Sequence, residues 1–139
     1  MRLLAIALTC VVLLEAQPAR YVELRRVIDR NTGFAHATRG VNMYTLYALR
    51  SCVSDRDMTV LHDMLRDKDR VTRLAVSSVL ADMGADGAKI LRDYLARTKD
   101  VTDKLMLQDA LDEAAKPDYR PILQYPLTDA ERARIHGCR

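Results

Sequence analysis

Residues 57–97 read DMTVLHDMLRDKDRVTRLAVSSVLADMGADGAKILRDYLAR, and this stretch decides the fold. Its apolar residues recur every three or four positions, which is the spacing of one face of an α-helix. The pattern also repeats, because VLHDML at 60–65 returns as ILRDYL at 90–95 and VT at 71–72 returns at 101–102. A repeat of about thirty residues holds two short helices. The sequence therefore predicts helix pairs that follow one another along the chain.

Helical periodicity continues on both sides of this stretch. We expect helices over residues 22–28, 41–53, 60–65, 69–83, 86–95 and 101–114. One extra residue aligns Leu105 and Leu111 with Leu74 and Leu80 of the preceding pair, so we expect an apolar stripe on the sixth helix. No segment alternates apolar and polar residues as a strand does. The prediction is an all-α protein in which three helix pairs stack and cover one another's apolar faces.

The chain beyond the last pair has a different composition. Three of the four prolines in the whole chain lie after residue 116. Proline disfavours helical conformation in the residue that precedes it. We therefore expect an irregular extended segment over residues 118–126. Thr128 and Glu131 then have the spacing of a capping box, which opens a helix, and Gly137 would close it.

Residues 67–95 resemble the short bacterial HEAT-like repeats, and the resemblance is good over residues 57–114. In that family an acidic turn precedes a helix rich in Ala and Leu, a glycine ends this helix, and the next repeat begins a few residues later. The residues that carry the resemblance are Asp67-Lys68-Asp69, Arg73-Leu74-Ala75-Val76, Val79-Leu80, Met83-Gly84, Ala88, Ile90-Leu91 and Leu95. The resemblance implies a short right-handed α-α solenoid of about three helix pairs, with an extended tail and a C-terminal helix. It also implies a binding scaffold, although some members of the family have enzymatic roles.

The first residues have the layout of a secretory signal peptide. Met1-Arg2 gives a positive start, residues 3–14 are apolar except for Thr9, and small residues with Pro18 follow. An apolar run of this length is too short to span a membrane, which takes about 20 residues in a helix. The alternatives are an N-terminal core helix of a cytosolic protein and a lipoprotein anchored through Cys10.

Cleavage is expected after Ala16, with cleavage after Ala19 as the alternative. The chain then divides into a signal peptide (1–16), a HEAT-like helical repeat domain (17–116) and a Pro-containing tail with a short helix (117–139). We expect the mature protein in the periplasm or outside the cell, with no stable membrane span after cleavage.

Removal of the signal peptide leaves two cysteines, Cys52 and Cys138. An even count in an oxidising compartment predicts a disulfide between them, with two free thiols as the alternative. The segment from Lys116 to Leu127 reaches roughly 35 Å at ~3.3 Å per residue, enough to return over helices stacked ~10 Å apart. In the chain-entropy model such a bridge stabilises the fold by up to about 4–5 kcal/mol.

The residue types of known active sites do not come together in the sequence. The histidines His36, His62 and His136 are far apart, and none has a metal ligand at a suitable spacing. The two remaining cysteines likewise lack a histidine partner. A glycine-rich phosphate loop, a serine elbow and a Cys–His pair at a known spacing are missing from the sequence. We expect no metal, no cofactor and no enzymatic activity.

The net charge of +3 is unevenly distributed along the chain. Residues 17–56 hold seven arginines against three acidic residues, whereas residues 57–116 hold ten basic and twelve acidic residues. Arginine binds carboxylates in a bidentate manner, so this end predicts a patch for an acidic protein or an anionic membrane surface, with a solvated face as the alternative. Nucleic acid is not an expected partner, because the net charge is small. The candidate patch consists of Arg20, Arg25, Arg26, Arg30 and Arg39.

Two functions from different classes fit these features. The first is an exported interaction scaffold for a protein partner, of which a periplasmic inhibitor or immunity-type protein that blocks an enzyme is a narrower version. The second is a ligand-binding or enzymatic domain with a pocket lined by Tyr44, Tyr47 and Tyr94. Tyrosines at helical spacing more often belong to the core, with only the hydroxyl at the rim. We therefore favour the interaction scaffold.

Overall fold

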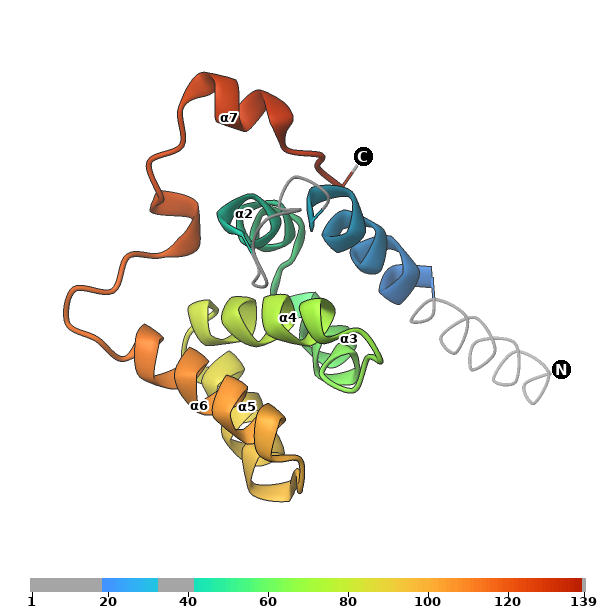
Figure 1. Cartoon of the computed structure of the whole chain (residues 1–139), viewed down its shortest axis with the longest axis vertical. Coiled ribbons are helices and arrows are strands. Elements are labelled where there is room, and N and C mark those ends of the chain that lie inside the picture. The colour runs from blue at the N-terminus through green and yellow to red at the C-terminus, as the bar shows by residue number, and fades with distance from the viewer. Residues whose placement is uncertain (1–18, 33–41, 139) are drawn as a thin grey trace, which may run out of the picture.

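The computed structural model describes residues 19–32 and 42–138, and within these ranges the protein is all-α without a β-strand (Figure 1). The all-α prediction is confirmed for these residues, whereas the predicted signal peptide at residues 1–16 lies outside them. The elements are a first helix at residues 19–32, α2 (Met43–Cys52), η1 (Asp55–Asp57), α3 (Met58–Met64), α4 (Arg70–Asp82), α5 (Ala85–Arg97), α6 (Val101–Ala114), η2 (Ile122–Gln124) and α7 (Asp129–Arg134).

Polar side chains fix where several helices begin. Asn42, Asp69 and Asp100 each accept a hydrogen bond from the backbone N–H three residues later, at 2.9, 3.0 and 2.9 Å. These bonds satisfy backbone donors that the first helical turn leaves without a partner. The predicted capping box is also present, because Thr128 and Glu131 exchange side-chain and backbone bonds of 3.1 and 2.7 Å. The starts of α2, α4, α6 and α7 are therefore encoded locally.

Most predicted helix bounds differ from the structure by a few residues, and two of the differences concern predicted glycine or capping positions. Helix α5 begins at Ala85 rather than at residue 86, because Gly84 adopts a φ of 85° and turns the chain directly out of α4. Helix α7 ends at Arg134 rather than at Gly137. The residues that follow α7 are extended, and they carry the chain back to the first helix.

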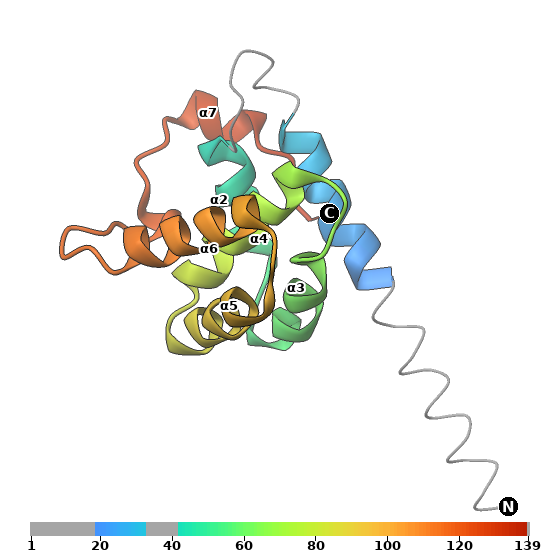
Figure 2. The ribbon, with the colours of Figure 1, turned by 60° about the horizontal axis from the view of Figure 1, so that its bottom comes forward.

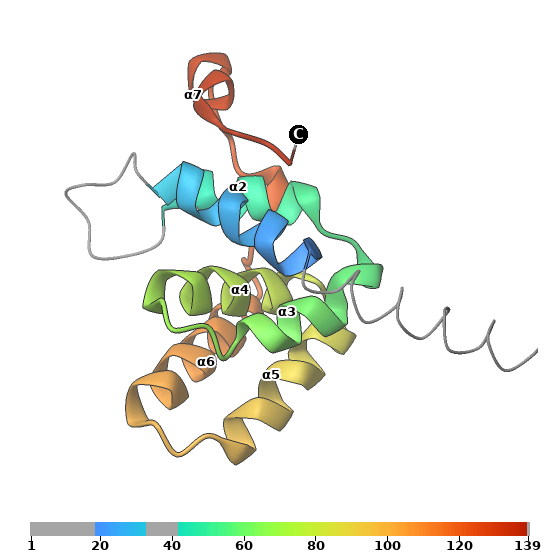
Figure 3. The ribbon, with the colours of Figure 1, turned by 90° about the vertical axis from the view of Figure 1, so that its right-hand side faces the viewer.

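The helices lie in three levels, which Figure 3 shows from the side. The first helix and α2 form one outer level, α3 and α4 the middle level, and α5 and α6 the other outer level. Helix α4 is central, because it packs against α2, α3, α5 and α6. Its Val76, Val79 and Leu80 are fully buried. The core therefore forms around α4, with contributions from Leu24, Ile28, Leu49, Leu61, Leu65, Leu91 and Leu107.

A glycine allows α5 to begin close to the end of α4. A Cβ atom at Gly87 would lie only 1.9 Å from the carbonyl oxygen of Leu80. Any side chain at this position would therefore collide with the backbone of α4.

The tail, residues 115–138, leaves α6 and returns to the level of the first helix (Figure 2). Ile122 and Leu127 are buried along the way, and η2 packs against α2. Helix α7 itself buries no residue. At the end of the tail, Cys138 lies at disulfide distance from Cys52, with their Cα atoms 5.6 Å apart. The prediction that these two cysteines pair is confirmed in the structure.

Among the residues that the structure describes, no helix combines the length and apolar character needed to cross a membrane.

Candidate functional site

Two of the five predicted patch arginines are half-buried and form ion pairs with aspartates of the same chain. The guanidinium of Arg20 donates to both carboxylate oxygens of Asp57, at 2.8 and 3.1 Å, and to the carbonyl oxygen of Cys52 at 2.8 Å. The hydrogen bond to Asp57 raises the pKa of Arg20. Arg25 donates to Asp67 at 2.6 Å and forms a longer pair with Asp29 at 3.3 Å. Arg20 and Arg25 therefore connect the first helix to the loops around α3.

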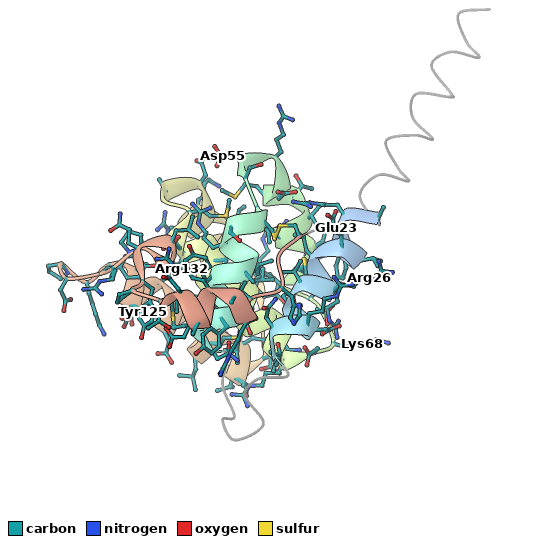
Figure 4. All side chains as sticks on the ribbon, turned by 90° about the horizontal axis from the view of Figure 1, so that it is seen from above. Glu23, Arg26, Asp55, Lys68, Tyr125 and Arg132 are labelled. Atoms are coloured by element: carbon teal, nitrogen blue, oxygen red, sulfur yellow. A yellow bond between two sulfur atoms is a disulfide. The ribbon has the colours of Figure 1, made fainter. Side chains whose placement is uncertain are left out.

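The remaining patch arginines have a different environment. Arg26 and Arg30 are exposed, and Figure 4 shows Arg26 pointing outward from the first helix. Arg39 lies outside the described residues. Val22 is 49% exposed on the same helix, and the acidic Asp29 is exposed beside these arginines. The structure thus leaves Arg26 and Arg30 on a surface of mixed charge.

Asp67 is the centre of a small polar network between the first helix and α3. It accepts hydrogen bonds from the hydroxyl of Tyr21, the guanidinium of Arg25 and the backbone N–H of Asp69. Burial favours the neutral acid, but these donors outweigh burial and hold the pKa of Asp67 below its ordinary value. Burial and the bond to Asp67 in turn raise the pKa of Tyr21 to about 12. This carboxylate is fully engaged in holding the two levels together.

Two further arginine–aspartate pairs connect neighbouring levels. Arg50 of α2 donates to Asp82 of α4 at 2.8 Å, and Arg73 of α4 donates to Asp103 of α6 at 3.2 Å. These pairs were not predicted from the sequence. Their partners are 32 and 30 residues apart, close to the repeat length. These ion pairs could therefore have been predicted from one pattern in the sequence. In that pattern an arginine is followed about thirty residues later by an aspartate.

The candidate chemical groups do not assemble into a reactive site in the described ranges. His62 is half-buried on α3, His136 is exposed in the tail, and His36 lies outside the described residues. Ser77 is buried, and its hydroxyl donates to the carbonyl oxygen of Arg73 at 2.7 Å. In the part of the chain that the structure describes, no group of His, Cys, Asp and Glu has a metal-binding arrangement.

A cleft lined by tyrosines is present, but its tyrosines are not the predicted ones. The phenol of Tyr44 bonds to Glu131 at 3.3 Å, while Tyr47 and Tyr94 pack against the core. Tyr119 and Tyr125 of the tail line a cleft of about 350 Å³ instead. This cleft is not apparent from the sequence, because it forms only where the returning tail meets α2, α4 and α6. Its apolar lining consists of Met43, Leu46, Ala81, Ala110, Ala114 and Ile122.

Among the residues that the structure describes, the two large apolar side chains with the highest exposed fraction lie on α6. Val101 is 71% exposed and Leu105 is 63% exposed, whereas Met106 and Leu107 on the opposite side are buried. Leu105 therefore belongs to the predicted apolar stripe of this helix, but no other described element covers the stripe at this position. Its counterpart Leu74 lies on α4, which has helices on several sides, whereas α6 belongs to an outer level.

A hollow lies between α5 and α6, and two of its lining residues, Gln108 and Asp112, lie three and seven positions after Leu105 on the same side of α6. It has a volume of about 690 Å³ and is lined mainly by alanines and leucines, with one arginine and one aspartate. We call the hollow together with Val101 and Leu105 the α5–α6 face. The residues of α5 and α6 that line the hollow are Ala85, Ala88, Arg92, Leu95, Ala96, Gln108, Leu111, Asp112 and Ala114.

Comparisons with protein-family models, curated proteins and solved structures give no significant match to this chain.

Proposed function

We propose that this protein is an exported helical scaffold that binds another protein through its α5–α6 face. The observation that carries the proposal is the exposure of Val101 and Leu105 beside an apolar hollow. Contiguous exposed apolar surface on a small protein is typical of a binding site, because covering it removes that surface from water. The face is mainly apolar and carries few charges. Such a surface suits a protein partner better than a nucleic acid, which is bound mainly through basic side chains that contact its phosphates.

We further propose that the three levels form a short right-handed α-α solenoid of the HEAT type. Three features support this arrangement: the three levels of two helices, the thirty-residue repeat, and the equivalent capping aspartates Asp69 and Asp100. In a solenoid each repeat contacts its neighbours, and the outer side of the last repeat has no following repeat. The α5–α6 face is that side.

Export is part of the proposal. It is supported by the charged and apolar start of the chain and by a pair of cysteines at disulfide distance. Mass spectrometry of the protein recovered from a bacterial host should show a chain that begins at Gln17 or Arg20. An intact Met1 in the soluble protein would contradict export.

The proposal includes no enzymatic activity and no cofactor. The buried carboxylates that could serve as catalytic groups, Asp57, Asp67 and Asp82, are each bound by an arginine. Their assigned role is to hold neighbouring levels together.

The binding proposal is tested with two leucine variants. A partner is first identified by cross-linking in the exporting host, and its dissociation constant is then measured with purified proteins. Leu105→Gln should weaken binding by at least about tenfold, because it replaces an apolar contact with a polar side chain. Leu123→Gln is the matched control, since Leu123 is 44% exposed on η2 and lies outside the face. Equal effects of the two variants would contradict the proposal.

A ligand-binding role is a second candidate, and the cleft at Tyr119 and Tyr125 favours it. Its volume lies at the lower end of small-molecule pockets, and its lining combines apolar side chains with polar and charged ones. Ala110→Leu should fill the cleft and abolish binding of a fluorescent apolar dye. Ala133→Leu, at an exposed position of α7, adds the same volume outside both the cleft and the α5–α6 face, and should leave dye binding unchanged. Dye binding that Ala110→Leu does not reduce would remove this candidate.

A further inference from the structure

We propose that the partner on the α5–α6 face is a second copy of this chain, related to the first by a two-fold axis. The inference rests on the proposed function, because it names the occupant of the same face. It follows from the shape of the face, from its charges and from what lies at the other end of the molecule.

The face combines a protrusion and a hollow. Val101 and Leu105 protrude from the first half of α6, near its connection to α5. The hollow extends toward Ala81, Gly84 and Ala115, at the opposite ends of the two helices. A two-fold axis that lies in the face between these regions places the protruding side chains of each copy over the hollow of the other. A surface with both shapes can therefore pack against itself.

The charges of the face are also self-complementary. Arg92 of α5 and Asp112 of α6 are both exposed and both line the hollow. Asp112 accepts a hydrogen bond from Gln108 at 2.8 Å, and neither Arg92 nor Asp112 has an ion-pair partner among the described residues. A two-fold axis midway between them brings Arg92 of each copy over Asp112 of the other. Two identical ion pairs then form, and no like charges are brought together by this pairing.

The opposite end of the molecule favours a closed pair of chains over a filament. The tail crosses the level of the first helix and α2, with α7 beyond α2, whereas α5 and α6 lie at the far end (Figure 3). It is held there by Cys138 at Cys52 and by bonds between Asn31 and His136. A head-to-tail contact would place the apolar α5–α6 face against this tail, whose α7 (DAERAR) is polar. Contact between two α5–α6 faces instead covers apolar surface with apolar surface.

The first experiment measures the mass of the protein in solution. The full chain is expressed in an exporting bacterial host, purified from the soluble fraction, and studied by sedimentation velocity and light scattering from low micromolar to near millimolar concentration. The expected result is a reversible equilibrium between one and two chains. Leu105→Gln should raise the dissociation constant by at least about tenfold, and Leu123→Gln should leave it unchanged.

A charge exchange tests the arrangement of the two copies. Arg92→Glu and Asp112→Arg should each weaken association, because each brings like charges together at both contacts. The double variant R92E/D112R should restore association toward that of the original protein. Circular dichroism melts check that all variants fold, which is expected because both residues are exposed. A double variant that associates no better than the single variants overturns the proposed arrangement.

The remaining outcomes separate this inference from the proposed function. A single-chain mass at every concentration, or a dimer that Leu105→Gln does not weaken, overturns the inference. A single-chain mass together with another protein whose binding depends on Leu105 also overturns it, but leaves the proposed function in place. If neither a second copy nor another protein depends on Leu105, both proposals fail.

Discussion

The side chain of Asn31 pairs with the backbone of His136, 105 residues later in the chain. Its amide nitrogen donates to the carbonyl oxygen of His136 at 2.8 Å, and its amide oxygen accepts from the N–H of His136 at 2.9 Å. Asn31 is fully buried and also donates to the carbonyl oxygen of Val27. One side chain thus joins the end of the first helix to the end of the tail.

Asn31→Ala should destabilise the protein by about 1–3 kcal/mol, because it removes the two bonds to the backbone of His136 and the bond to the carbonyl oxygen of Val27. The free energy of unfolding is measured by urea denaturation. Gln124→Ala, at an exposed amide on η2, is the control and should change the stability by less than about 0.5 kcal/mol. Equal stabilities for the two variants would show that the tail is held without Asn31.

The Cys52–Cys138 pair should make the stability sensitive to reduction. Reductant should lower the free energy of unfolding by up to about 4–5 kcal/mol, since the reduced unfolded chain gains the entropy of a long open loop. The double variant C52S/C138S should have the lower stability of the reduced protein and no further response to reductant. Peptide mapping without reductant checks the link, and labelling of both thiols in the native protein would contradict it.

Gly87→Ala should destabilise the protein by at least about 3 kcal/mol, the upper end of overpacking effects. The added methyl would lie 1.9 Å from the backbone oxygen of Leu80, and a backbone atom cannot move aside as a flexible side chain does. Gly137→Ala is the matched control, because a Cβ there meets no atom within 4 Å. Thermal melting of the two variants makes the comparison, and a Gly87→Ala melt like that of the control would mean that α4 and α5 are not in this close contact.

Tyr21 should make the protein sensitive to alkaline pH. Burial disfavours the phenolate, and together with the hydrogen bond to Asp67 it raises the pKa of Tyr21 to about 12, above the unfolded value of about 10. The neutral phenol therefore stabilises the folded state fully below pH 10 or so, and this contribution is lost as the pH rises through about 12. The free energy of unfolding of Tyr21→Phe should decline less over this range than that of the original protein.

The control for this prediction is Tyr125→Phe, at a tyrosine that is 42% exposed. Its pH profile should follow that of the original protein. If Tyr21→Phe loses stability with rising pH as steeply as Tyr125→Phe does, then Tyr21 does not contribute to the alkaline sensitivity of the fold.

Local sequence signals predicted the elements of the fold well. The helix over residues 101–114 has the predicted bounds, and Thr128 and Glu131 form the capping box that their spacing indicated. The cysteine count also gave the correct pair. These features depend on neighbouring residues or on a count, so they can be recognised without knowing how the helices pack.

The candidate surfaces could not be predicted in the same way. Arg20 and Arg25 resembled free surface charges in the sequence, but their aspartate partners are 37 and 42 residues away. Leu105 has the periodicity of a core residue and is 63% exposed. Periodicity identifies the apolar side of a helix, and it does not say whether another element covers that side.

The sequence by itself determined that the described part of this protein is built from short helices, roughly where these helices lie along the chain, and that Cys52 pairs with Cys138. Helix propensity, capping and repeat spacing depend on residues that are close together or one repeat length apart in the chain. They can therefore be recognised in the sequence without knowledge of the packing. Only the tertiary structure decided that Asp57, Asp67 and Asp82 would neutralise arginines from other levels, and that Val101 and Leu105 would face outward. Both outcomes depend on which helices become neighbours, and that is settled when the levels stack and the tail closes over one end.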